Sequence, residues 1–194
     1  SLAIDNMLLF RSVQLLQNAH KQNYSTAFFC DISADTFGDQ NFLSDFIEYL
    51  EINRNMAPCV VFQLSQSDLA ARADDTGPDL QRLVDVGYRL CMNEVTDLNF
   101  DPTGLAQLGF RFVKIHVKHL LKKNIMPTPE SIQNIKISLD EAGVDLIIDG
   151  IETEQELIEL LDFNIDLGQG YLFGEPRMSK DPSDNTKPPE LRVV

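Results

Sequence analysis

The feature that most constrains the fold is an alternation between short apolar runs and amphipathic helical segments. The clearest unit begins at 146–148, where the sequence LII suits a strand buried on both faces. Thr153 and Glu156 then form a capping-box pattern that opens a helix, with apolar residues at helical spacing up to Leu161. A second short strand is expected just before the glycine-spaced turn at 168–170. The same pairing of strand and helix recurs along the chain.

Further apolar runs predict strands at 27–32, 59–64, 88–95 and 110–117. Helices are predicted from 3 to 21, from 40 behind the capping residue Asp39, from 77 to 87, and from 129 to 143. In the helix at 3–21, one broad apolar face is expected to include Ile4, Leu8, Val13 and Leu15. About six short strands that alternate with helices indicate a parallel α/β fold. This rhythm is compatible both with a (β/α) barrel and with an open doubly wound sheet.

The composition restricts the partners more than the fold. The chain has 194 residues and 43% hydrophobic content, which is enough for one packed domain. Its net charge of -14 repels polyanions, so neither a nucleic-acid polymer nor an anionic membrane surface is expected as a partner. A small anionic ligand stays compatible with this charge if local cations and helix N-termini receive it.

The cysteines and the lengths of the apolar runs indicate in which cellular compartment the chain is expected. Cys30, Cys59 and Cys91 stand far apart in apolar runs, without the spacing of a zinc site, which predicts buried free thiols in a reducing cytoplasm. No apolar run is long enough to span a bilayer, so no membrane segment is expected in this chain, although a longer protein that contains it could be anchored elsewhere. Residues 1–177 are expected to form the folded domain, and residues 178–194 a flexible tail rich in Pro, Asp, Ser and Lys.

Polar residues follow strand after strand where each predicted strand ends. Any one of them would be unremarkable as a solvated loop residue or a hydrogen-bonded strand cap. Because parallel strands bring their carboxyl ends to one edge, the whole set predicts a shared pocket. The set comprises Asp31, Gln63, Asn93, Glu94, Lys114, His116, Asp149 and Gln169.

Two motifs identify a family resemblance. The sequence GIETEQEL at 150–157, followed by QGYLFGEP at 169–176, resembles the C-terminal signature of EAL domains, the bacterial cyclic di-GMP domains. The resemblance implies a modified (β/α)8 TIM-type barrel and covers roughly residues 2–177. The family's first strand, which carries the Glu-Ala-Leu signature, has no counterpart here, so the N-terminal strand or strands are expected to lie outside this chain.

The resemblance also implies altered metal positions. Active EAL domains hydrolyse cyclic di-GMP with two divalent metals, which need several carboxylates at close quarters. The family's metal-binding Asn falls on Asp31, a metal-binding Glu falls on the neutral Gln63, and the paired aspartates fall on Asn93 and Glu94. The lysine of the family's Lys-Ile-Asp motif is kept as Lys114, but the aspartate is replaced by His116.

These departures predict that the domain is not an enzyme. The family's general-base glutamate falls on Asp149, which is one methylene shorter, and such a misplacement can cost about 100-fold in rate. No catalytic residue is therefore predicted, Lys114 and Asp149 being degenerate equivalents. No cofactor is required on this view, and neither Mg²⁺ nor Mn²⁺ is expected.

The predicted function is that of a cyclic di-GMP receptor in bacterial signalling. The run GFRFVKIHVKHLL at 109–121 and the ending after FGEPR look most similar to EAL-like proteins of flagellar assembly. That similarity implies a role in motility and protein partners of the flagellar machinery. The sequence leaves a homodimer open. Two alternatives stay open: a ligand-free scaffold that acts only through protein contacts, and a weak metal-dependent phosphodiesterase.

The predicted ligand-binding residues include the last segment of the resemblance. Phe173 is predicted either to pack against a guanine or to complete the barrel core, whereas Tyr171 and Leu172 are expected in the core. The full predicted set is Asp31, Gln63, Asn93, Glu94, Lys114, Asp149, Gln169, Gly170, Phe173 and Pro176.

Overall fold

The computed structural model describes residues 2–20, 27–71, 77–121, 129–165 and 167–174. Its sheet has six parallel strands in the order β1-β2-β3-β4-β5-β6, so each strand pairs with its neighbour in sequence. This confirms the parallel α/β prediction. The strands are β1 (Phe28–Asp31), β2 (Val60–Ser65), β3 (Arg89–Asn93), β4 (Phe110–His116), β5 (Asp145–Asp149) and β6 (Leu167–Gly168).

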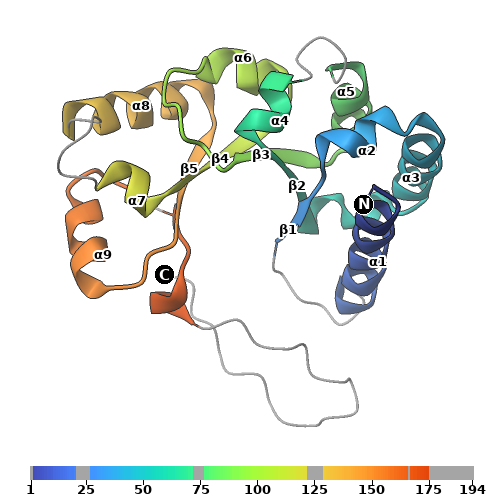
Figure 1. Ribbon diagram of the computed structural model, residues 1–194, viewed down its shortest axis with the longest axis horizontal. Coiled ribbons are helices and arrows are strands. Elements are labelled where there is room, and N and C mark those ends of the chain that lie inside the picture. The colour runs from blue at the N-terminus through green and yellow to red at the C-terminus, as the bar shows by residue number, and fades with distance from the viewer. Residues whose placement is uncertain (1, 21–26, 72–76, 122–128, 166, 175–194) are drawn as a thin grey trace, which may run out of the picture.

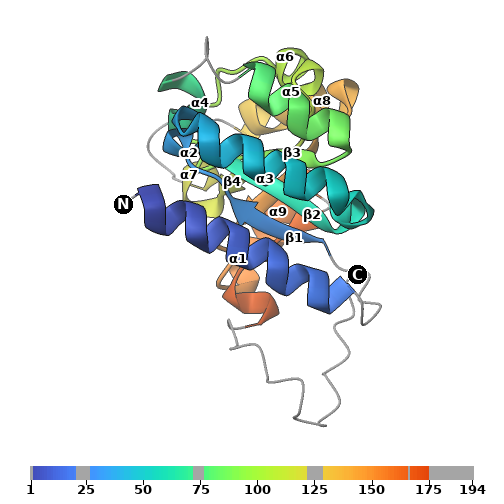
Figure 2. The same ribbon diagram turned by 90° about the vertical axis from the view of Figure 1, so that its right-hand side faces the viewer.

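The sheet curls into part of a barrel, with its helices on the convex side (Figure 1). Figure 2 shows β1 between α1 and α3, and these two helices run in roughly the same direction across the view. The helices are α1 (Leu2–His20), α2 (Ala34–Gly38), α3 (Gln40–Ile52), α4 (Gln66–Ala71), α5 (Gly77–Val86), α6 (Pro102–Gln107), α7 (Val117–Leu120), α8 (Pro129–Ala142) and α9 (Glu154–Leu161). Two 3-10 turns, η1 (Arg54–Cys59) and η2 (Tyr171–Phe173), complete the described elements.

Two of the helices begin at the capping side chains that the sequence predicted. Asp39 accepts the N–H of Phe42 and caps α3, and Thr153 and Glu156 form both halves of the capping box of α9. These bonds satisfy backbone N–H groups that the first turn of a helix leaves without partners. None of the helices in the described parts of the chain is both long enough and apolar enough to cross a membrane.

The two faces of the sheet have different roles. Side chains on the convex face, such as Phe62, Leu90 and Ile115, are fully buried under the helices and form the hydrophobic core. Successive residues of a strand point to opposite faces, so the positions between them line the concave side. There, Phe29 of β1 meets Phe112 of β4 with ring centroids 5.8 Å apart.

A bulge in β4 separates two aromatic rings that strict alternation would place on one face. Leu90 of β3 pairs with Phe110, but the next residue, Cys91, pairs with Phe112. The extra residue, Arg111, is exposed and donates to the carbonyl of Phe110. Phe110 therefore lies in the core while Phe112 faces the concave side, which shifts the register of all the polar residues that follow.

The prediction for the first helix was partly wrong. Val13 is buried as expected, together with Leu9, but Ile4, Leu8 and Leu15 are each more than half exposed. Helix α1 lies at the end of the arc, where β1 pairs on one side only among the described strands. A helix at such an end has sheet beneath only part of its surface. The proposed boundary between a domain at 1–177 and a tail at 178–194 falls outside the described residues.

Candidate ligand-binding site at the carboxyl ends of the strands

The carboxyl ends of the parallel strands surround a hollow of about 440 Å³. Strand register brings its residues together, because Asp31 pairs with Gln63 and His116 with Asp149. Most of the predicted site residues line this hollow. Its lining consists of Asp31, Gln63, Asn93, Glu94, Thr96, Lys114, His116, His119, Asp149 and Gln169.

A buried lysine forms the floor of the hollow. Lys114 is 7% exposed, and its Nζ donates to Gln63 Oε1 at 3.0 Å and lies 4.3 Å from the ring centroid of Phe29. Gln63 in turn donates from Nε2 to Asp31 Oδ1 at 2.7 Å. The amide of Gln63 thus links an ammonium group to a carboxylate, and the ring of Phe29 adds a cation–π contact. These contacts offset part of the hydration that a buried ammonium group loses.

The end of β3 offers a second polar group. Asn93 Nδ2 lies 3.4 Å from Asp31 Oδ1, while Asn93 Oδ1 is buried and accepts no hydrogen bond from the described residues. A buried acceptor of this kind favours a ligand that carries a donor. The next residue, Glu94, has a positive φ of 50°, a conformation that non-glycine residues seldom adopt. Its backbone turns the chain away from the strand at the rim of the hollow.

Two histidines form one wall. His116 caps α7, accepting the N–H of Lys118 on Nδ1 at 3.2 Å, as the prediction of a hydrogen-bonded strand residue implies. The ring of His119 lies 6.4 Å from that of His116, at 87°. Sequence reasoning missed both His119 and Thr96 as lining residues. The signal for His119 was its position three residues after His116 at a helix start, which places both on one helix face.

The last two strands continue the wall beside the histidines, because His116 pairs with Asp149. Asp149 Oδ1 accepts the N–H of Gly150 at 2.7 Å, so part of this carboxylate is engaged by its own turn. The backbone of Gln169 binds on both sides, donating to Ile148 at 2.8 Å and accepting from Ile151 at 3.0 Å. These two bonds fix where β6 ends and hold Gln169 beside Asp149 in the lining.

The remaining predicted residues lie elsewhere. Gly170 packs its backbone against Ile151 rather than lining the hollow, and Phe173 is 50% exposed beside Gly168. Tyr171 is 60% exposed, so its assignment to the core was wrong, whereas Leu172 packs partly buried against the core as predicted. Pro176 lies outside the described residues.

No group of three or more His, Cys, Asp or Glu side chains in the described ranges is arranged so that it could hold a metal ion. The hollow instead combines three carboxylates, those of Asp31, Glu94 and Asp149, with neutral amides, two imidazoles and one buried ammonium. This set of groups suits hydrogen bonding to a polar ligand with anionic parts.

A comparison with curated proteins found relatives of this chain among cyclic di-GMP phosphodiesterases. The chain is 23% identical over 118 residues to the cyclic di-GMP phosphodiesterase RocR of Pseudomonas aeruginosa, covering 60% of this chain and 30% of RocR. It therefore spans less than a third of that relative.

Solved structures share the fold. The FimX EAL domain superposes with a TM-score of 0.77 at 22% identity, covering 92% of this chain and 73% of that one. The Xanthomonas citri FimX EAL domain in complex with c-diGMP gives a TM-score of 0.76 at 16% identity, covering 93% and 72%. The six curled strands thus correspond to a large part of an EAL barrel, as predicted. The sequence model of the EAL domain family matches residues 1–176, and we conclude that the chain belongs to the EAL domain family.

Proposed function

We propose that this chain is a non-catalytic EAL domain that binds cyclic di-GMP without a metal ion and acts as a receptor in the bacterial cytoplasm. The observation that carries the proposal is the chain of contacts from Lys114 through Gln63 to Asp31. At this position the family has a metal-binding glutamate, whereas here the neutral amide of Gln63 is engaged by both the Lys114 ammonium and the Asp31 carboxylate.

The groups present do not fit a pair of divalent cations. Gln63 carries no charge, and its Oε1 already accepts from the Lys114 ammonium at 3.0 Å. A metal ion at this oxygen would meet an ammonium group at contact distance, and like charges repel strongly in a partly buried site. Asn93 supplies a neutral amide in place of a carboxylate. Weak hydrolysis would need both this repulsion and the short reach of Asp149 to be overcome.

The same groups suit an anionic dinucleotide. An ammonium group has three donors, and the hydrogen bond from Lys114 to Gln63 uses one of them, so Lys114 can still donate to a phosphate oxygen. His116 and His119 place further ring nitrogens along the same wall, and Asn93 Oδ1 can accept from a base or ribose donor. Among the relatives, RocR is a cyclic di-GMP phosphodiesterase, and the Xanthomonas citri FimX EAL domain was solved in complex with c-diGMP.

Calorimetric titration with cyclic di-GMP tests the proposal. We expect micromolar binding that is unchanged by EDTA or by added Mg²⁺. Lys114→Met should weaken binding by about tenfold or more, because a charge-assisted hydrogen bond contributes about 1.5–3 kcal/mol. Lys118→Met is the matched control, since it removes the same charge from an exposed residue outside the hollow, and it should bind like the parent chain.

Other outcomes separate the alternatives. Absence of heat with the folded parent chain would contradict the receptor proposal and favour a scaffold that works only through protein contacts. Formation of linear pGpG that depends on Mg²⁺ or Mn²⁺ would contradict the non-catalytic assignment.

We further propose that the receptor serves flagellar assembly through a protein partner. Support comes from the similarity of the segment at 109–121 to EAL-like flagellar proteins. In the intact protein, Lys114→Met should reduce swimming in soft agar to the level of a deletion strain, while Lys118→Met should not. Sedimentation of the chain with and without ligand tests whether it also forms a homodimer.

A further inference from the structure

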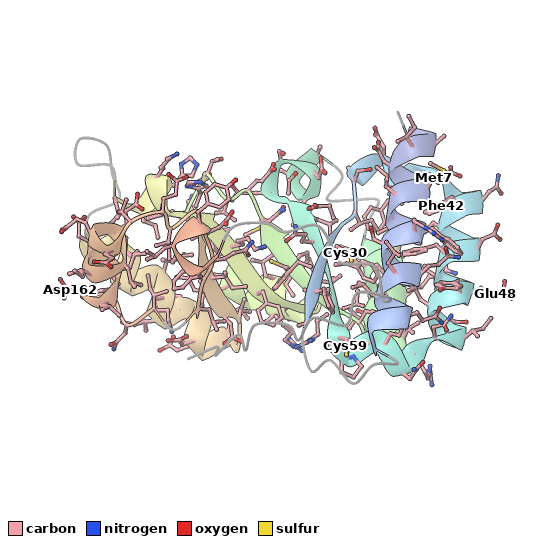
Figure 3. The ribbon with its side chains drawn as sticks, turned by 90° about the horizontal axis from the view of Figure 1, so that it is seen from below. Met7, Cys30, Phe42, Glu48, Cys59 and Asp162 are labelled. Carbon is pink, nitrogen blue, oxygen red and sulfur yellow. The ribbon has the colours of Figure 1, made fainter. Side chains whose placement is uncertain are left out.

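A second hollow lies on the outer surface between α1 and α3, away from the strand ends. Its volume is about 640 Å³. The lining side chains come from both helices, and Figure 3 shows Met7 of α1 and Phe42 of α3 close together there. We call this hollow the α1–α3 groove and define it by Met7, Phe10, Arg11, Phe42, Asp45 and Tyr49.

The floor of the α1–α3 groove is aromatic. The rings of Phe10 and Tyr49 lie 4.6 Å apart, and Phe42 stacks on Phe46 at 5.5 Å with 13° between the ring planes. Met7 is 63% exposed at its edge. Aromatic residues, Met and Arg are the types enriched at the centres of protein interfaces, and Met adapts its shape to a partner.

Hydrogen bonds join α1 to neighbouring elements at both ends of the groove. At one end, buried Asn6 of α1 donates to Asp39 Oδ2 at 3.2 Å and accepts from Thr36 Oγ1 at 3.0 Å. At the other end, the Tyr49 hydroxyl donates to Gln17 Oε1 at 3.0 Å, and Gln17 also donates to Asn53. These polar contacts fix the two helices relative to each other while the apolar middle stays accessible. A preformed groove reduces the entropy lost when a partner binds.

The rim of the groove is acidic. Asp39 and Asp45 lie in the lining, and Glu48, which is outside the lining, is exposed one turn after Asp45 on the outer side of α3 (Figure 3). Arg11 is the basic residue of the lining, and it donates to Gln14. Together with the net charge of -14, this rim favours a basic occupant and disfavours an anionic membrane surface.

We propose that the α1–α3 groove binds an amphipathic α-helix of a partner protein. Its apolar residues, at spacing i, i+3 or i+4, and i+7, fill the space over Phe10 and Phe42. Lys or Arg side chains on one flank pair with Asp45 and Glu48. This interface is separate from the ligand-binding hollow, so it does not depend on the proposed receptor function.

Selection from a displayed library of randomised 16-residue helical peptides tests the proposal. Selected peptides should be net positive, carry the apolar spacing above, and lose affinity in 0.5 M salt. In fluorescence anisotropy, Met7→Glu and Asp45→Lys should each weaken their binding by about tenfold, the size of a typical hot-spot loss. The matched controls are Ile158→Glu on α9 and Asp162→Lys directly after it, which make comparable charge changes at exposed positions and should alter affinity less than about twofold.

Three results would overturn the proposal. The library could yield no peptide above background. The selected peptides could bind the groove variants as well as they bind the α9 variants, with circular dichroism showing that all four variants are folded. Lastly, the chain could form a dimer that Met7→Glu dissociates, which would make a second copy the occupant.

Discussion

At the scale of single residues, two glycines shape the edge of the ligand-binding hollow. Gly150 has φ of +76°, and a Cβ there would lie 2.3 Å from Nε2 of His116. Gly170 has φ of +153°, and a Cβ there would lie 2.1 Å from the carbonyl oxygen of Ile151. A side chain can turn away, but backbone cannot, so Gly170 is the stricter requirement. Backbone packing alone therefore accounts for the glycine at position 170 of the family motif.

This difference gives a stability prediction. Gly170→Ala should lower the free energy of unfolding by about 3 kcal/mol or more, since it combines backbone strain with a clash. Gly143→Ala is the control, because Gly143 also has a positive φ, +71°, but open space around its Cβ position. That change should cost about 1 kcal/mol. Urea unfolding followed by circular dichroism measures both, and equal losses would contradict the packing argument.

At the scale of one element, α9 illustrates a helix whose start is fixed locally. Its carboxylate at Glu156 accepts the N–H groups of Glu152 at 2.9 Å and Thr153 at 3.0 Å. These hydrogen bonds lower the pKa of Glu156, and the bond from the backbone of Glu152 has the largest effect. Its folded pKa lies below its ordinary value, so this contribution to stability is present above that value and is lost as the pH falls through the folded pKa.

Thr153→Ala should therefore destabilise the chain by about 1 kcal/mol, the usual cost of losing a cap. The side chain of Thr153 accepts the N–H of Glu156 at 3.2 Å, which alanine cannot do. Thr103→Ala at the start of α6 is the control, since Asp101 provides that cap. Thermal unfolding should show a lower midpoint for the first variant only. If both midpoints fall equally, the capping box is not the cause.

At the scale of the whole molecule, the curled sheet buries several groups that would ionise in alkaline solution. Burial raises the pKa of the Cys91 thiol to about 12. Burial, followed by the nearby charge of Asp31, raises the pKa of the Cys30 thiol to about 11. Burial also raises the pKa of Tyr88 to about 12. These shifts arise from the packed core and not from any local sequence motif.

The shifts predict alkaline destabilisation. The unfolded chain releases these protons near pH 9 for the thiols and near pH 10 for the phenol, whereas the folded chain keeps them. Stability should be unaffected by these groups below about pH 9 and should fall as the pH rises from there through the folded pKa values of about 11 and about 12. Urea midpoints at a series of pH values measure this fall, and Cys91→Ala should make it shallower. A midpoint that stays constant up to about pH 10.5 would contradict the prediction.

Much of the fold could be predicted from local patterns in the sequence. The runs at 59–64 and 146–148, and the caps at Asp39 and Thr153, depend on side chains within a few residues, so these two strands and two helix starts were predicted correctly. The polar strand ends also met as expected, because parallel strands share one edge. The EAL motifs then distinguished the barrel from an open sheet.

The remaining features were decided by tertiary structure. The bulge at Arg111 depends on the pairing of β4 with β3, and the exposure of Leu8 and Leu15 depends on the position of α1 at the end of the arc. The sequence determined which polar residues stand at the strand ends. Only the folded sheet decided that Lys114 donates to Gln63 over the ring of Phe29, because those residues come from different strands and meet through register and curvature.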